Sequence, residues 1–320
     1  KPGSIMIRAA MQSMNAETLD EVKRKNLYKE VFEDFSKDGV ETYSDIMLGL
    51  PMETLKTYVD GVLQLIDSNI DEFSMPQTLV LKGTPMEASD YLEKFDIKTK
   101  SRVIPECSGL YWNSSGEVSE FEHMIMHTST MSFDDYIECR KFVLLIMIFH
   151  NTRMLKNIYK FLDYLNIKRS IFFREIINAS LASDTLGPLF DNFVKLTKEE
   201  LFDEDVVPNS SDIEEITSNK IYKFLSVALM KYKTSLIEIV STALQNPLIK
   251  MDQKEVQFFV EMITNKFMND IVLDRAIEIK DIPSRVSDVF SSKTYKCFLS
   301  DFQLTRIESL LKTYPKKEMY

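Results

Sequence analysis

One ten-residue segment combines a carboxylate, a glycine and a helix-start signal in an order that suits ligand binding. It runs from residue 45 to residue 54 and has the sequence DIMLGLPMET. Strand alternation places Asp45 and Gly49 on one face and apolar side chains on the other. An aspartate on the inward face of a buried strand is costly unless something binds it, and Gly49 permits close backbone approach. We therefore expect a ligand or a buried polar partner at Asp45; the alternative is a hydrated aspartate at the strand entrance.

A second polar group is expected at the same end of a neighbouring strand. Gln12, Ser13 and Asn15 follow the apolar run at 5–11, so they should lie on the same rim as Gly49. Ligands of parallel α/β folds bind at the carboxyl ends of the strands. Taken alone, polar residues between a strand and a helix are more often helix caps than ligands, and by spacing alone Arg24 fits a solvated charge within the KRK run at 23–25 better than a ligand.

Strand and helix patterns alternate over the first hundred residues. Strand-like runs at 5–11, 40–50 and 72–81 are separated by helical patterns that begin near Asn15 and Thr54. Parallel strands joined by crossover helices form βαβ units, and three such strands make part of a barrel. Residues 1–100 are therefore predicted to be a partial parallel, TIM-like barrel.

The chain beyond residue 100 has a different pattern. Residues 101–132 are predicted to be an irregular connector, with a short strand pair around Val103 and 121–126. Of the eight glycines only Gly187 follows residue 116, and capping-box pairs begin at Thr197, Ser211 and Asp252. Residues 133–320 are therefore predicted to form a helical domain, which makes the fold class α/β followed by all-α.

Three segments together resemble the latter half of a radical S-adenosylmethionine (SAM) barrel of the cobalamin-binding-domain type. They are MQSMN at 11–15, KRKN at 23–26 and DIMLGLPMET at 45–54. Members of that superfamily carry a QS.N strand end, an R.N helix element and a D.I.GLPGET strand in this order and at similar separation. The segments LKGTPM at 81–86 and TSTMSFDDY at 128–136 extend the resemblance to roughly the first half of the chain. Met52 departs from the usual glycine.

The resemblance implies roles for five residues in binding SAM. Gln12 and Asp45 would bind the ribose hydroxyls and Arg24 the methionine carboxylate, with Ser13 and Gly49 completing the set. These roles suit the chemistry, because an amide and a carboxylate can hold a diol and a guanidinium pairs bidentately with a carboxylate.

The resemblance also implies a [4Fe-4S] cluster and cobalamin in a full-length enzyme that cleaves SAM reductively. The CxxxCxxC motif and the cobalamin domain of the family are not found in these 320 residues. We expect upstream cluster-binding and cobalamin-binding regions to supply them. The sequence begins at Lys1 and is expected to be a carboxy-terminal fragment without radical activity of its own. The sequence does not identify the substrate.

Composition and spacing argue against several other classes of function. A net charge of −10 disfavours nucleic acids and anionic lipid. The longest apolar run, at 142–149, is too short to cross a bilayer, and no signal-peptide pattern opens the chain, so a cytoplasmic location is expected. The cysteines are too widely spaced for a local metal or redox motif. His123 and His127 have a helix-like metal spacing, but they fall in a strand-like pattern.

Two alternatives stay open. One is a helical protein- or peptide-interaction module on a partial α/β scaffold, which would show a basic or exposed apolar groove along residues 211–267. The other is an unrelated barrel enzyme whose active-site half lies outside this sequence.

Overall fold

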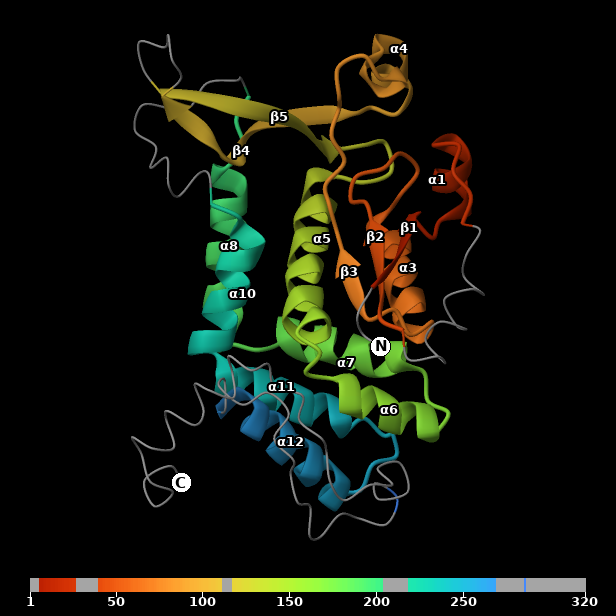
Figure 1. Ribbon diagram of the computed structural model, residues 1–320, viewed down its shortest axis with the longest axis vertical. Coiled ribbons are helices and arrows are strands. Elements are labelled where there is room, and N and C mark those ends of the chain that lie inside the picture. The colour runs from red at the N-terminus through yellow and green to blue at the C-terminus, as the bar shows by residue number, and fades with distance from the viewer. Residues whose placement is uncertain (1–5, 27–39, 111–116, 204–217, 269–284, 286–320) are drawn as a thin grey trace.

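A small parallel sheet forms the first part of the molecule (Figure 1). The computed structural model describes residues 6–26, 40–110, 117–203, 218–268 and 285. The strand order is β1 (Ile7–Gln12), β2 (Thr42–Ile46) and β3 (Glu72–Ser74), with both pairs parallel. Helix α1 (Ala16–Glu21) follows β1, and α3 (Leu55–Asp67) connects β2 to β3. The predicted parallel neighbours are therefore confirmed.

The two faces of the sheet differ in chemistry. Ile46 and Phe73 share one face of the sheet and belong to the buried core that also contains Tyr58 of α3, and the Phe73 ring centre lies 4.9 Å from that of His150. Arg8 and Asp45 bind each other from neighbouring strands on the opposite face. The sheet thus has one apolar face and one polar face, as alternation requires.

The predicted starts of both early helices are confirmed. The Asn15 side chain accepts a hydrogen bond from the Glu17 backbone at the start of α1. At the start of α3, the Thr57 N–H donates to Thr54 Oγ1 at 3.0 Å and the Thr54 N–H donates to Thr57 Oγ1 at 2.9 Å. This reciprocal pair satisfies backbone donors that a helix leaves open at its amino end.

The third strand is shorter than the predicted run at 72–81. It ends at Ser74, and Pro76, which has no backbone N–H, follows two residues later. Beyond it the chain pairs with β5 (Glu117–His127): the Ile125 N–H donates to Thr78 O at 3.0 Å, and the Val80 N–H donates to His123 O at 2.9 Å. Strand β5 therefore lies beside the segment that follows β3.

Residues 98–110 and 117–127 form two long antiparallel strands, so the prediction of an irregular connector was wrong for these residues. The hairpin pairs β4 (Lys98–Leu110) with β5, and short helices η1 (Pro85–Glu87) and α4 (Ser89–Lys94) precede it. The predicted pairing of Val103 with 121–126 is present, in register with Phe121. Pro105 lies where the register shifts between Val103 and Ser108, and a strand tolerates proline at such an irregularity.

The described residues after 132 are predominantly helical, as predicted. The elements are α5 (Phe133–Leu145), a π-helical turn η2 (Ile146–Asn151), α6 (Lys156–Tyr164), α7 (Arg169–Leu181), α8 (Gly187–Glu199), α10 (Lys220–Lys231), α11 (Lys233–Leu244) and α12 (Gln253–Met268).

The three predicted capping boxes have different outcomes. The pair at Asp252 is confirmed, because the Glu255 N–H donates to Asp252 Oδ1 at 2.9 Å and the Asp252 N–H donates to Glu255 Oε2 at 3.0 Å. The pair at Thr197 was wrong, because Thr197 lies inside α8 and no helix begins there. Ser211 lies outside the described residues.

A continuous hydrophobic core links the sheet to the helices, from Met11 on β1 to Ile263 on α12. In Figure 1, α5 stands beside β3, the hairpin lies above them, and α6, α7, α11 and α12 lie below. In the part of the chain that the structure describes, no helix combines the length and apolar character needed to cross a bilayer.

Candidate functional site

The segments that follow β1 and β2 are joined by side-chain hydrogen bonds at the carboxyl end of the sheet. Asn15 Nδ2 donates to Met52 O at 2.9 Å, and the Ser13 hydroxyl donates to the Glu53 carboxylate. Asn26 Nδ2 donates to Ser13 O at 2.8 Å. Three polar segments at 11–15, 23–26 and 45–54 therefore meet at one rim.

Glu53 is the residue at this rim that sequence reasoning missed. Its side chain is buried, and burial raises its pKa, while hydrogen bonds from Ser13 and Thr57 lower it. Thr130 Oγ1 donates to Glu53 O at 2.7 Å, which ties the rim to the segment before α5. An acidic residue before a helix is ordinary in sequence, and neither spacing nor residue type reveals that this one is buried.

Asp45 has a polar partner, as expected. Its side chain is 8% exposed, and Oδ2 accepts a hydrogen bond from Arg8 Nε at 2.5 Å. The Arg8 guanidinium carbon also lies 5.9 Å from the centre of the Tyr43 ring. Within the described residues, Oδ1 of Asp45 accepts no hydrogen bond.

Gln12 and Arg24 contact the rim through their backbones. Gln12 O accepts from the Met47 N–H at 2.8 Å, which places Gln12 and Gly49 at the same end of the sheet, as predicted. The Arg24 N–H donates to Leu19 O at 2.8 Å, and the Arg24 side chain is exposed. The convergence of the Gln12, Arg24 and Asp45 side chains on one cavity stays a prediction.

Two residues after β2 have positive φ, for different reasons. Gly49 has a φ of 92°, and a Cβ atom there would lie 3.3 Å from Ile125 O, so the close approach comes from strand β5. Met52 has a φ of 65°, in the left-handed region where a side chain is disfavoured. This conformation explains why glycine suits the Met52 position.

A cavity of about 660 Å³ lies beside the sheet, between β3 and helices α5 and α10. Its lining includes Tyr43 and Glu72 from the sheet, Arg102 from β4, Arg140 from α5 and Lys220 from α10. Its volume is in the range of small-molecule sites.

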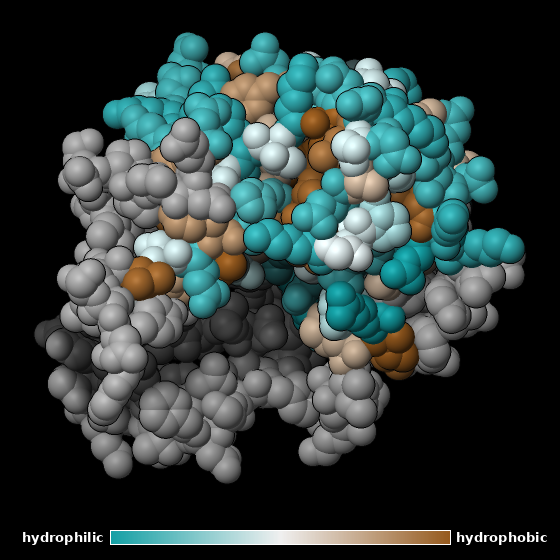
Figure 2. All heavy atoms as spheres, turned by 90° about the horizontal axis from the view of Figure 1, so that it is seen from above, coloured by the Kyte–Doolittle hydropathy of each residue, from teal (hydrophilic) through white to brown (hydrophobic). Residues whose placement is uncertain are grey.

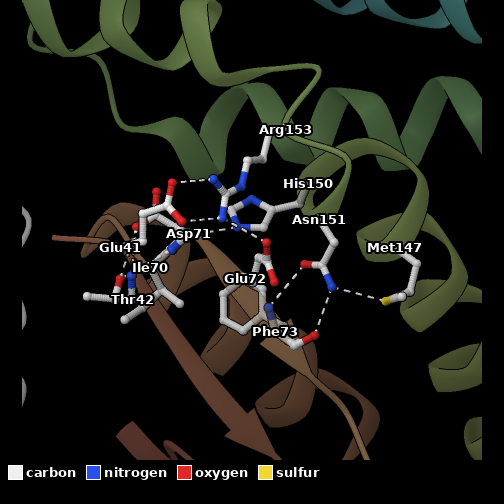
Figure 3. A network of polar contacts seen from close by, with 10 residues as sticks. All are labelled: Glu41, Thr42, Ile70, Asp71, Glu72, Phe73, Met147, His150, Asn151 and Arg153. Carbon is white, nitrogen blue, oxygen red and sulfur yellow. Dashed lines mark hydrogen bonds and ion pairs between the residues drawn. The ribbon is translucent and has the colours of Figure 1, made fainter. Parts of the chain in front are cut away.

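The opposite ends of β2 and β3 are held by a polar network (Figure 3). Arg153 donates to Glu41 at 2.5 Å and to Glu72 at 2.8 Å. His150 Nε2 donates to Ile70 O at 3.0 Å, and its Nδ1 lies 3.3 Å from the Tyr159 hydroxyl. Burial lowers the pKa of His150 to about 3, so this imidazole is neutral and structural near neutral pH.

The described residues do not fit an iron-sulfur cluster or another metal site. No group of three His, Cys, Asp or Glu side chains among them could hold a metal ion. Cys139 is buried in α5, where burial raises the pKa of its thiol and disfavours the thiolate that ligation requires. His123 and His127 lie on strand β5, as the alternation indicated, where a spacing of four has no helical geometry.

Exposed apolar side chains give little support to an interaction groove on the helices. In the described part of residues 211–267, Tyr222 and Met230 are exposed on α10, and Leu248 follows α11. On the end of the molecule that carries the hairpin, apolar side chains form a narrow strip between hydrophilic ones (Figure 2).

Comparison with known proteins gives two distant relatives. No protein-family model matches the chain. The cobalamin-dependent radical SAM methyltransferase TokK of Streptomyces tokunonensis is 27% identical over 148 residues, which are 44% of this chain and 21% of that protein. A 2-(S-pantetheinyl)-carbapenam-3-carboxylate methyltransferase of Streptantibioticus cattleyicolor is 25% identical over 148 residues, with the same coverage. The matched stretch thus spans about a fifth of each relative, and over 44% of its length the chain is similar to cobalamin-dependent radical SAM methyltransferases.

Proposed function

We propose that this chain is the carboxy-terminal part of a cobalamin-dependent radical SAM methyltransferase. Residues 1–100 would be the last part of the SAM-binding barrel, 101–132 the connection to the helices and 133–320 a helical domain. One observation carries the proposal: the contacts of Ser13 with Glu53, Asn15 with Met52 and Asn26 with Ser13 join the three segments that resemble the family. Methyl transfer comes from the names of the two relatives.

The groups on the polar face and rim fit SAM chemically. Asp45 keeps one carboxylate oxygen without a hydrogen bond from the described residues, and the Gln12 amide stands at the end of the adjacent strand. A carboxylate and an amide are suited to the two hydroxyls of a ribose. Arg24, exposed at the same end, would pair with the methionine carboxylate. Ser13 and Gly49 would shape the backbone around the cofactor, and SAM when bound would supply the methyl group.

In this proposal, regions outside this sequence bind the iron-sulfur cluster and cobalamin. No three described His, Cys, Asp or Glu side chains are grouped so that they could hold a metal, so no step through the cluster is assigned to them. The chain by itself should bind SAM weakly and have no radical activity. Its residues would orient the cofactor against the rest of the enzyme.

Calorimetric titration of SAM under anaerobic conditions tests the proposal. The sample for the titration is a longer polypeptide that also contains the upstream cluster-binding region. It is compared with variants of the same polypeptide that carry Asp45→Ala or Arg24→Ala. Each substitution removes a charged hydrogen bond and should weaken binding by roughly 1–3 kcal/mol, or about 5- to 150-fold.

Two matched variants separate the cofactor role from simple changes of charge. Arg8→Ala breaks the ion pair with Asp45 but keeps the carboxylate, and Lys25→Ala removes a neighbouring exposed charge. Both should bind SAM within about threefold of the parent protein, since neither removes a group assigned to the cofactor. Unchanged affinity in both Asp45→Ala and Arg24→Ala would overturn the assignment.

A further inference from the structure

Arg140 is a buried cation whose described partners are all neutral. It lies on α5 with only 5% of its surface exposed. With its amide oxygen turned toward the helix, Gln77 accepts from Arg140 Nη1 at 2.8 Å and from Nε at 3.0 Å. The Phe193 ring centre lies 5.8 Å from the guanidinium carbon. An amide and a ring satisfy hydrogen bonds and packing, but they do not balance a charge, and a buried charge without a counter-charge is costly.

The carboxylates of the same cavity are already paired with other cations. Glu200 lies 3.6 Å from Arg102 and 3.7 Å from Lys220, measured between the nearest oxygen and nitrogen atoms. Glu72 accepts from Arg153 at 2.8 Å. Arg102 is also paired with Glu122, so among the three cations of the lining (Arg102, Arg140 and Lys220) Arg140 is the one that forms no ion pair with a described carboxylate.

The orientation of Arg140 leaves one edge of its guanidinium for a ligand. Nε and one N–H of Nη1 face Gln77, so the pair of donors on Nη1 and Nη2 is not used by the described residues. Two parallel donors on a guanidinium match the two oxygens of a carboxylate. The cavity is also lined by apolar side chains, among them Val143 and Met147.

We propose that this cavity binds a small organic monocarboxylate, with Arg140 as the counter-charge for its carboxylate and Val143 and Met147 against its apolar part. A single uncompensated cation matches one negative charge better than the two charges of a phosphate. The assignment follows from Arg140 and its cavity alone, so it stands or falls separately from SAM binding at the rim.

The test uses the 320-residue chain and three probes of the cavity. The first is 4-phenylbutyrate, the second is its neutral amide 4-phenylbutyramide, and the third is inorganic sulfate, each titrated by calorimetry and by thermal unfolding. The carboxylate should bind saturably and raise the unfolding midpoint, because a ligand that binds only the folded state stabilises it. The amide should bind at least about tenfold more weakly, since it lacks the charge.

Variants then locate the site. Arg140→Met should weaken 4-phenylbutyrate binding by about tenfold to a hundredfold, and Arg140→Lys should give an intermediate loss, because lysine keeps the charge without the paired donors. The matched control is Arg174→Met, which removes an exposed arginine on α7. It should leave binding unchanged.

Three outcomes would overturn the proposal. They are no saturable binding of the carboxylate to the parent chain, equal binding of the amide, or sulfate binding as tight as that of the carboxylate. These comparisons need only the parent chain, so they decide the matter even if Arg140→Met does not fold. SAM affinity is measured in a separate experiment. A failure of carboxylate binding therefore says nothing against SAM binding at the rim, and the reverse also holds.

Discussion

The side-chain amide of Asn151 pairs with both backbone groups of Phe73. Its Oδ1 accepts from the Phe73 N–H at 3.0 Å, and its Nδ2 donates to Phe73 O at 2.8 Å (Figure 3). Phe73 is the middle residue of β3, and β2 is the strand on its other side. The amide thus imitates one residue of a neighbouring strand and satisfies edge groups that would otherwise need a partner.

Replacing Asn151 with aspartate should therefore destabilise the fold. A carboxylate cannot donate to Phe73 O, so a buried carbonyl would lose its partner and face a negative charge. We expect a loss of about 1–3 kcal/mol in the free energy of unfolding by urea. Asn157→Asp is the control, because within the described residues Nδ2 of Asn157 donates to the sulfur of Met262 and to no backbone carbonyl. Equal losses in the two variants would argue against the edge role.

His150 should make stability depend on pH below neutrality. Burial lowers its pKa to about 3 in the folded chain, against an ordinary value of 6.5. Between these values the unfolded chain binds a proton that the folded chain excludes, so the free energy of unfolding should fall as the pH is lowered through this window. The contribution of His150 is at most about 1.4 kcal/mol per pH unit.

His150→Gln should flatten this dependence, measured by urea unfolding at several pH values from 7 down to 5. A slope that is the same in the parent and in His150→Gln would show that carboxylates alone cause the acid sensitivity.

Met52→Gly should stabilise the chain relative to Met52→Ala. At a φ of 65° any Cβ is disfavoured, whereas glycine adopts this conformation readily. Both variants remove the methionine side chain, so their difference isolates backbone strain. We expect glycine to be more stable by about 1 kcal/mol, measured as a shift in the thermal unfolding midpoint.

Gly49→Ala should lower the free energy of unfolding more than Gly83→Ala does. Both glycines have positive φ, 92° and 78°, so both substitutions strain the backbone. A Cβ on Gly49 would meet Ile125 O at 3.3 Å, whereas a Cβ on Gly83 has no neighbour within 4 Å. By chemical unfolding, we expect Gly49→Ala to lose about 1–2 kcal/mol more stability than Gly83→Ala. This difference reports the close packing of β5 against the segment that follows β2.

Local rules predicted the sheet and the helix starts. Parallel pairing followed from the alternation of strands and helices, and Asn15, Thr54 and Asp252 were identified as caps because capping depends on residues two or three positions apart. The need of Asp45 for a partner was also visible from the alternation of its strand.

Contacts between distant residues were not predictable in this way. Arg8 meets Asp45 across 37 positions, and Asn151 meets Phe73 across 78 positions, so no local pattern indicates either pair. The hairpin was underestimated because Pro105 and the nearby glycines resemble strand breakers. The register shift between Val103 and Ser108, within which Pro105 lies, becomes visible only once both strands are known.

Among the described residues, the sheet has an open edge at β1 and a covered edge at β3. At β3, Phe73 is covered by Asn151, and the chain beyond it is paired with β5 through Thr78. On the other side β1 is the last strand among the described residues, and the backbone of a terminal strand is a template for strand addition. A strand from elsewhere in the protein, or from a second copy, would therefore join beside β1 and set its own inward side chains next to Arg8 and Gln12. New strands would therefore be added to the sheet on the β1 side and not on the β3 side.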